Sequence, residues 1–256
     1  MILRRVIAHF RKQEWTAIAI DFLIVVAGIL LAFQITEWNE ARREHARERD
    51  YLQRIAMELD HSIVEIEDSI RISKGREELG RFLMDATENP DLVREDPGRF
   101  IAAVIQAGYT FSPSIRAHTF EEIKSAGDLA IFRDKALLLD ISEFYTVVQG
   151  AAQWHYLREL VQTEYTKRRA GILTYAQTIE TSKFGDVPDI SADEAMGAYA
   201  RMLERPDFIE WLPTMTNRGD DIRLYNKWLA MATDLRARIR TAPPQSGPAP
   251  DGKVNQ

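Results

Sequence analysis

Cysteine is absent from this chain of 256 residues, which excludes disulfide bonds, thiolate metal sites and a cysteine nucleophile. The sequence also lacks internal repeats and any useful length of the alternating pattern that is typical of strands. The net charge is −6 and no basic patch carries interleaved aromatic residues, so nucleic-acid binding is not expected. There is no G-x-S-x-G, P-loop, G-x-G-x-x-G or H-E-x-x-H motif. These absences argue against an enzyme, and no cofactor or metal is expected.

Only one long apolar run is present, from Trp15 to Ile35 (WTAIAIDFLIVVAGILLAFQI), and its only ionisable residue is Asp21. At about 1.5 Å per residue it reaches roughly 31 Å, enough to cross the hydrocarbon core of a bilayer. Trp15 and Trp38 bracket it as membrane-interface anchors. The run exceeds the usual h-region of about 7–15 residues, and no small-x-small cleavage site follows it. The sequence therefore predicts an uncleaved, single-pass signal anchor rather than a signal peptide or a buried core helix.

The orientation of this anchor depends on the Lys and Arg residues that flank it, because the positive-inside rule counts these cations and not the net charge. The two flanks nearly tie. Arg11 and Lys12 lie closer to the apolar run than Arg42 does, which favours an N-terminus inside and a C-terminal body outside. The cations counted are Arg4, Arg5, Arg11 and Lys12 before the run and Arg42, Arg43, Arg47 and Arg49 after it.

One face of the anchor is distinct, because Ala17, Asp21, Gly28 and Ala32 are spaced so that they share one side of a helix. Gly28-x-x-x-Ala32 is a small-xxx-small pair, which lets two membrane helices approach closely. A carboxylate at Asp21 is costly unless it is protonated, hydrated or paired. Two interpretations stay open: a helix contact with a second copy or a membrane-protein partner, or ordinary small residues with Asp21 hydrated from the interface.

The rest of the chain predicts an all-α fold. The expected divisions are a short cytoplasmic N-terminus at 1–14, the anchor at 15–36, a helical soluble domain at 37–240 and a disordered, Pro/Gly-rich tail at 241–256. The helix is expected to continue beyond the membrane, because an apolar stripe with 3/4 spacing follows the anchor. That stripe consists of Leu52, Ile55, Leu59, Ile63, Ile66 and Ile70.

Further helix boundaries follow from capping and breaking residues. Asn89-Pro90 and Asp96-Pro97-Gly98 indicate loops, and a short helix is expected from Arg99 to Ala107, before a turn at Ser112-Pro113. Thr119-x-x-Glu122 and Ser191-x-x-Glu194 resemble capping boxes, and Gly127 is expected to end a helix. Asp134 is expected to cap one long helix over 135–182. Helical structure is expected to be interrupted at Phe184 to Pro188. A last helix near 216–240 carries Tyr225, Trp228, Ala232, Leu235 and Ile239 in a stripe.

Two stretches carry a resemblance. GILLAFQITEWNEARREHARERDYL, which includes Gly28, Ala32, Gln34 and Trp38, and TFEEIKSAGDLAIFRDKALLLDISEFY, which includes Ser125-Ala126-Gly127 and Phe144-Tyr145, cover about 50 residues. They resemble an uncharacterised bacterial domain-of-unknown-function family of small single-span membrane proteins, whose anchor ends in G-I-x-x-A-x-Q-x-x-x-W-N-E. Where this chain has Asp21, the family is expected to have Glu. The resemblance implies the topology and a place in the bacterial cytoplasmic (inner) membrane, but no activity.

Three sets of residues could bear chemistry. Glu58-x-x-His61 has the spacing of di-iron bundles, but a second such motif is missing, so a solvated polar face is favoured. His118 with Glu121 and Glu122 is explained by the helix dipole, which favours acids at a helix start. His155 lies on an apolar seam, where a hydrogen-bonded core or interface histidine is favoured over a ligand.

Three hypotheses about function remain. The leading one is a membrane-tethered, non-catalytic helical module that binds a partner or assembles with itself. The second is an extracytoplasmic ligand-sensing helical domain that signals through a partner, which a closed apolar pocket would favour. The third is an enzyme whose site combines His61, His118, His155 and nearby acids, which convergence of these histidines would favour.

Overall fold

The computed structural model describes residues 15–180 and 189–241. Within these ranges every regular element is a helix, so the predicted all-α class is confirmed. The chain divides into two units: the first contains its start up to Tyr51, and the second runs from Leu52 to Pro243. The predictions for 1–14, for the break at Phe184 to Pro188 and for the tail from 242 onward lie outside the described residues.

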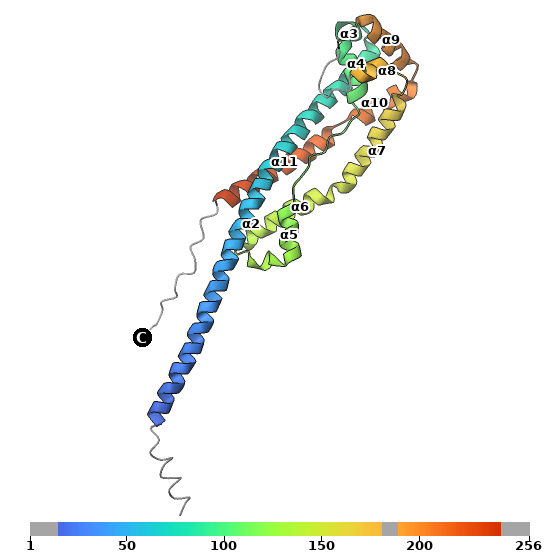
Figure 1. Cartoon of the computed structure of the whole chain (residues 1–256). Helices are drawn as coiled ribbons and strands as arrows, with labels where there is room; N and C mark the ends of the chain where they lie inside the picture. Colours follow the sequence, from blue (N-terminus) through green and yellow to red (C-terminus); the bar gives the residue numbers. More distant parts are fainter. Residues whose placement is uncertain (1–14, 181–188, 242–256) are drawn as a thin grey trace, which may run out of the picture. The chain divides into compact units, whose positions relative to one another are not determined.

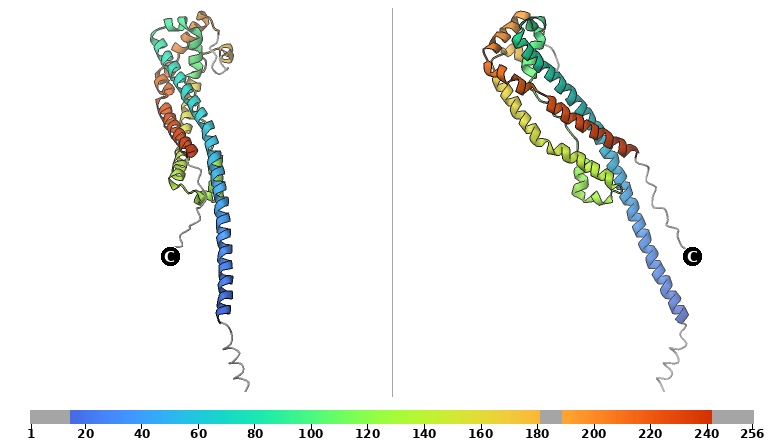
Figure 2. Two further views of the ribbon diagram at one scale, coloured as in Figure 1. Left: turned by 90° about the vertical axis from the view of Figure 1, so that its left-hand side faces the viewer. Right: turned by 180° about the vertical axis from the view of Figure 1, so that it is seen from behind.

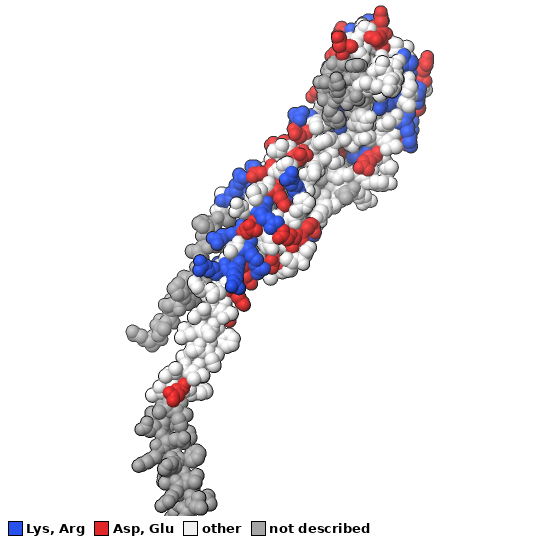
Figure 3. Space-filling view, viewed as in Figure 1, with Lys and Arg blue, Asp and Glu red and all other residues white. Residues whose placement is uncertain are grey.

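Helix α2 (Trp15–Glu88) is a single helix of 74 residues (Figure 1). Its large apolar side chains between Ile20 and Ile35, except Val26, are 51–67% exposed, and it is long and apolar enough to cross a membrane. Figure 3 shows this stretch as a white band with one acidic spot at its N-terminal end, where Asp21 lies. From Ile55 onward the apolar stripe of α2 is buried instead. The predicted continuation of the anchor into a packed helix is therefore confirmed.

At its C-terminal end, α2 joins a core shared with five other helices of the second unit: α3 (Asp91–Glu95), α4 (Pro97–Gln106), α7 (Ala152–Arg168), α9 (Ala192–Leu203) and α10 (Pro206–Thr216). The start of α4 is capped by Asp96, whose side chain accepts the Arg99 N–H at 3.1 Å. The predicted capping box of Ser191 and Glu194 is present. The buried side chains include Phe100, Val104, Met202 and Phe208.

The predicted helix over 135–182 is wrong, because the chain forms α6 (Lys135–Gly150), α7 (Ala152–Arg168) and α8 (Tyr175–Glu180) there. Gly150 ends the first of these, and Gly171 adopts a left-handed φ of 85° after the second. Glycine weakens a helix and accepts positive φ without strain. The predicted cap is confirmed, since the Asp134 carboxylate accepts the Leu137 N–H at 2.9 Å.

Helix α5 (His118–Ala126) and the 3₁₀ turn η1 (Asp128–Ile131) precede α6. Gly127 ends α5 at a left-handed φ of 75°, as predicted. The predicted capping box at Thr119 is wrong, because α5 starts two residues earlier than such a cap requires and Ala117 occupies its N-cap position. The cap comes from a distant residue instead: Glu58 of α2 accepts the Thr119 N–H at 3.0 Å and its hydroxyl at 2.8 Å.

Helix α11 (Gly219–Thr241) buries the stripe predicted for the last helix, from Tyr225 to Ile239. Its C-terminal arginines fasten it to two other helices. Arg236 lies 3.2 Å from Asp60 of α2, and Arg238 pairs with Asp140 of α6. The views of the second unit agree that α11 runs beside α2 and the α6–α7 pair (Figures 1 and 2).

The extended segment 107–117 connects α4 to α5 by running between α7 and α11 (Figures 1 and 2). Its carbonyls are held by two buried guanidinium groups. Arg218 Nη2 donates to Ala107 O at 3.1 Å and to Tyr109 O at 3.3 Å, and Arg76 Nη1 donates to Tyr109 O at 2.9 Å. Burial, and then the charge of Arg218, lower the pKa of Arg76 to about 10. Arg76 therefore stays charged at neutral pH, and both guanidinium groups satisfy carbonyls that no helix satisfies.

Candidate ligand groove

The junction of α6 and α7 is a bend rather than a loop. Ala151 alone separates the two helices, and it keeps a right-handed helical conformation (φ −79°, ψ −3°). Its N–H donates to Val148 O at 3.2 Å, three residues back, so the helix is locally tightened. Gly150 is exposed, and a Cβ added there would meet open space. The bend is therefore not packed against another element at this residue.

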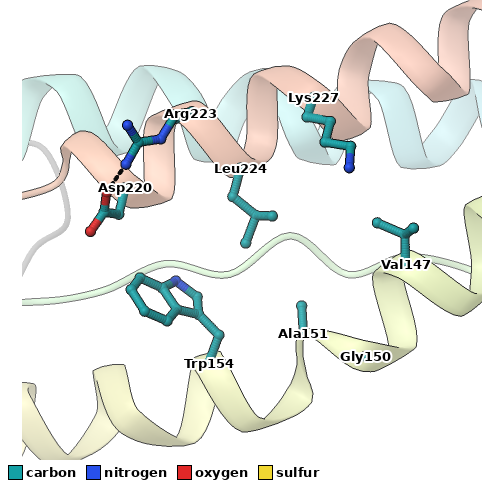
Figure 4. A pocket seen from close by; sticks show the side chains of 8 residues that line it. All are labelled: Val147, Gly150, Ala151, Trp154, Asp220, Arg223, Leu224 and Lys227. Carbon is teal, nitrogen blue, oxygen red and sulfur yellow. Dashed lines mark hydrogen bonds and ion pairs between the residues drawn. The ribbon is translucent and has the colours of Figure 1, made fainter.

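A groove with a volume of about 490 Å³ lies between this bend and α11. Figure 4 shows Val147, Ala151 and Trp154 pointing from the bend toward α11, where Leu224 points back toward them. The wall is mainly apolar, and its charged groups come from α11. The lining residues are Val147, Gly150, Ala151, Trp154, Asp220, Arg223, Leu224 and Lys227.

The indole of Trp154 is held in position from two sides. Its Nε1 donates to Asp221 Oδ1 at 3.0 Å, and the guanidinium of Arg158 lies over its ring at 4.7 Å from the centroid. Arg158 Nε donates to the same carboxylate oxygen at 2.9 Å. Because the side chains of Arg158 and Asp221 are only 12% and 4% exposed, this pair is desolvated and its geometry is restricted. The aromatic wall of the groove is therefore pre-formed.

The charges of the groove do not cancel. Asp220 and Arg223, one helical turn apart on α11, form an ion pair with each other. Lys227 is exposed, and among the described residues no carboxylate pairs with it. One positive charge therefore remains uncompensated beside the apolar wall. Such a site favours an anion that carries an apolar body.

His155, which follows Trp154 in the chain, forms a polar cluster with Ser112 and Tyr225. His155 Nδ1 is 2.7 Å from Ser112 Oγ, and Ser112 also hydrogen-bonds Tyr225. The imidazole packs against Tyr225 and Trp228, with ring centroids 6.4 and 5.9 Å apart. Burial lowers the pKa of His155 below its ordinary value, although Asp221 and Glu159 oppose this shift. His155 thus joins α7 to segment 107–117, in agreement with the core or interface histidine favoured by the sequence.

The other predicted candidates do not converge. Glu58 caps α5, whereas His61 Nε2 lies 2.8 Å from Arg116 Nη2. His118 is exposed, and Glu121 pairs with Lys124 and Gln149. In residues 15–180 and 189–241, no group of three His, Asp or Glu side chains could hold a metal ion. The observation that would have favoured the enzyme hypothesis is therefore missing from the described chain.

The predicted anchor residues, by contrast, lie on one helix. Trp15, Ala17, Asp21, Gly28, Ala32 and Trp38 all belong to α2. Asp21, Gly28 and Ala32 are exposed, a Cβ added to Gly28 would meet open space, and Arg42 lies over the Trp38 ring at 5.8 Å. The side chains of Trp15 and Ala17 lie outside the described residues. The contact role of this face stays a prediction.

The groove was not predicted from the sequence. The local signal for it was Gly150-Ala151 within the predicted 135–182 helix, where glycine weakens the helix. A tryptophan, Trp154, follows three residues after Ala151. A second cavity of about 300 Å³ was missed too, and it is lined in part by Gln177 and Arg201. Arg201 there donates to Ile172 O at 2.8 Å and to Gln177 Oε1 at 3.2 Å, so it supports the local fold.

Comparison with known proteins gives no relative, since no family model, curated protein or solved structure matches this chain. The function is therefore inferred from the contacts and charges of the chain itself.

Proposed function

We propose that this chain is a single-pass membrane protein whose helical unit, Leu52–Pro243, is a non-catalytic module that binds a partner protein or a second copy. The observation that carries the proposal is the change of environment along α2. Its large apolar side chains from Ile20 to Ile35, except Val26, are more than half exposed, and such a surface is unfavourable in water but suited to lipid. The same helix supplies buried residues from Ile55 onward.

The proposed location is a bacterial inner membrane, with the N-terminus inside and the helical unit outside the cytoplasm. Arg11 and Lys12 close to the apolar run support this orientation. The resemblance around Gly28 to Glu40 supports membership of the single-span bacterial family.

Binding rather than catalysis is supported by the roles of the polar residues. Glu58, His61 and His155 contact other helices or segment 107–117. At the same time, α7 exposes Tyr156 and Leu157 by 59% and 47%. Exposed apolar side chains close together on one helix are a common feature of protein-binding surfaces.

Membrane extraction and a topology reporter test the location. The full chain should stay in the membrane pellet after alkaline carbonate treatment. A reporter that is active only outside the cytoplasm, fused after Gln256, should be active, whereas one that folds only inside should be dark. Release into the supernatant would refute the anchor, and the opposite reporter pattern would refute the orientation and move the search for partners to the cytosol.

Crosslinking in native membranes tests self-assembly through the anchor. Changing Gly28 and Ala32 together to leucine should weaken the crosslinked dimer, because bulky side chains prevent close helix approach. Val26→Leu is the matched control, because it lies about 200° from Gly28 around the helix. Asp21→Asn should leave insertion and pairing intact, whereas Asp21→Leu should impair pairing only. Equal amounts of crosslinked dimer in every variant would exclude the face that carries Asp21, Gly28 and Ala32 as a contact.

A ligand-sensing function is the second candidate, and the groove beside Trp154 is the observation that favours it. It is open rather than closed, but it combines an apolar wall with few charges.

A further inference from the structure

We propose that the groove between the α6–α7 bend and α11 binds a small aromatic carboxylate, with its ring against Trp154 and Leu224 and its carboxylate on Lys227. This assignment goes beyond partner binding, and it does not depend on the direction in which the chain crosses the membrane. It gives the ligand-sensing candidate a chemical class of ligand.

The size and lining of the groove suit a small molecule. Its volume of about 490 Å³ lies within the range of roughly 300–1,000 Å³ typical of small-molecule sites. Val147, Ala151 and Trp154 supply apolar side chains on one side of the groove and Leu224 supplies one on the other (Figure 4). Both sides of the groove are helices, whose backbone groups bond internally. An extended peptide would therefore find no row of free donors and acceptors like that of a sheet edge.

An aromatic body is favoured because the indole of Trp154 is already fixed. Asp221 holds its Nε1 at 3.0 Å, and Arg158 lies over its ring. A ligand ring can therefore pack against this side chain without first ordering it, which lowers the entropic cost of binding. Aromatic pairs also gain affinity beyond that expected from the area they bury.

An anionic group is favoured by the charge balance. Asp220 is committed to Arg223, and Asp221 to Arg158 and Trp154. Lys227 alone among the charged lining residues has no partner in the described part of the chain. A carboxylate on the ligand would compensate this charge, whereas an ammonium group would be repelled.

Calorimetric titration of the full chain in phosphatidylcholine nanodiscs tests the assignment, with empty nanodiscs as the blank. The probes share one ring system and differ in charge: 2-naphthoate, 2-naphthamide and 2-naphthylmethylammonium. The carboxylate should bind about two- to fivefold more tightly than the amide, the range expected for a partly exposed ion pair, and the ammonium should bind most weakly. Equal affinities would overturn the role of Lys227, and no binding of any probe would overturn the site.

Two variants locate the binding. Gly150→Leu places a side chain in the groove without a clash at Cβ, so naphthoate affinity should fall at least about tenfold while the far-UV circular dichroism stays unchanged. Lys227→Met keeps the apolar stem and should equalise the acid and the amide without abolishing either. The matched control is Lys74→Met, because Lys74 is also an exposed lysine, on α2, and its loss should change nothing.

Retained naphthoate binding in folded Gly150→Leu would show that the probe binds elsewhere and would overturn the assignment. An unchanged preference for the acid in Lys227→Met would overturn the role of the lysine even if Gly150→Leu did not fold. Both measurements are independent of extraction, topology and crosslinking, so failure of this proposal and failure of the proposed function are distinguishable.

Discussion

Replacing Gly108 with alanine should destabilise the helical unit strongly, because the backbone at Gly108 lies directly against the ring of Tyr165. A Cβ built on Gly108 would come within 3.0 Å of ring carbons of Tyr165, whereas carbon atoms normally stay about 3.5–4.0 Å apart. The ring would have to move by at least about 0.5 Å. It is fully buried, and its hydroxyl donates to Ala103 O at 3.2 Å and Val104 O at 3.0 Å.

The magnitude follows from these contacts. Overpacking a buried site costs about 1–3 kcal/mol, and weakening the tyrosine hydrogen bonds adds about 1 kcal/mol. A loss of about 3 kcal/mol corresponds to a fall of roughly 6–12 °C in the unfolding midpoint of a unit of this size. Backbone strain does not contribute, because the positive-φ glycines of the described chain are Gly127 and Gly171.

Gly150→Ala is the matched control, since it is the same chemical change at a glycine where an added Cβ meets open space. It should raise stability by about 0.5–1 kcal/mol, because alanine favours a helix over glycine. Thermal unfolding of the full chain in mild detergent, followed by near-ultraviolet circular dichroism, measures both. If the free energy of unfolding of Gly108→Ala lies within about 1 kcal/mol of that of the unmodified chain, the close packing against Tyr165 is refuted.

Three further predictions concern buried polar groups. The unfolded state takes up a proton on His155 near pH 6.5, whereas burial lowers the pKa of this group in the folded state, so the stability of the chain should fall as pH drops through that region. The thermal unfolding midpoint should fall less with pH in His155→Gln than in the unmodified chain. Identical pH profiles of the two proteins would exclude a contribution from this group. The Tyr145 hydroxyl is buried without a partner among the described residues, so Tyr145→Phe should raise stability by about 1 kcal/mol in urea unfolding. A loss of stability in the same measurement would instead reveal a hydrogen bond to Glu58. Arg218→Met should cost about 3 kcal/mol, because it removes charged donors from buried carbonyls, and Arg218→Lys should recover only part of this; a lysine variant as stable as arginine would contradict the role of the planar guanidinium group.

Much of the fold is local in origin and was therefore predictable. The apolar stripe of α11, the Asp134 cap and the glycine stop at Gly127 each depend on residues within a few positions of one another. Their spacing alone specifies the structure.

The errors have a common physical cause, which is long-range contact. Thr119 looked like a cap, but its hydroxyl donates to Glu58, 61 residues earlier in the chain. The split of the helix after Gly150 could be suspected from glycine alone, but the groove depends on α11, which supplies its opposite wall. Pairing of Trp154 with Asp221 across 67 residues leaves no local signal.

The arginine contacts of segment 107–117 have a consequence for the order in which the protein folds. Arg218 Nη2 and the carbonyl of Ala107 are separated by 111 residues, so this bond cannot form until almost the whole helical unit has been synthesised. Until then the carbonyl of Ala107 lacks this donor and stays hydrated, while α2 and α4 can already form from local contacts. Docking of the last helix therefore completes the interior, and a nascent chain that stops before Arg218 is expected to remain open to proteases and chaperones.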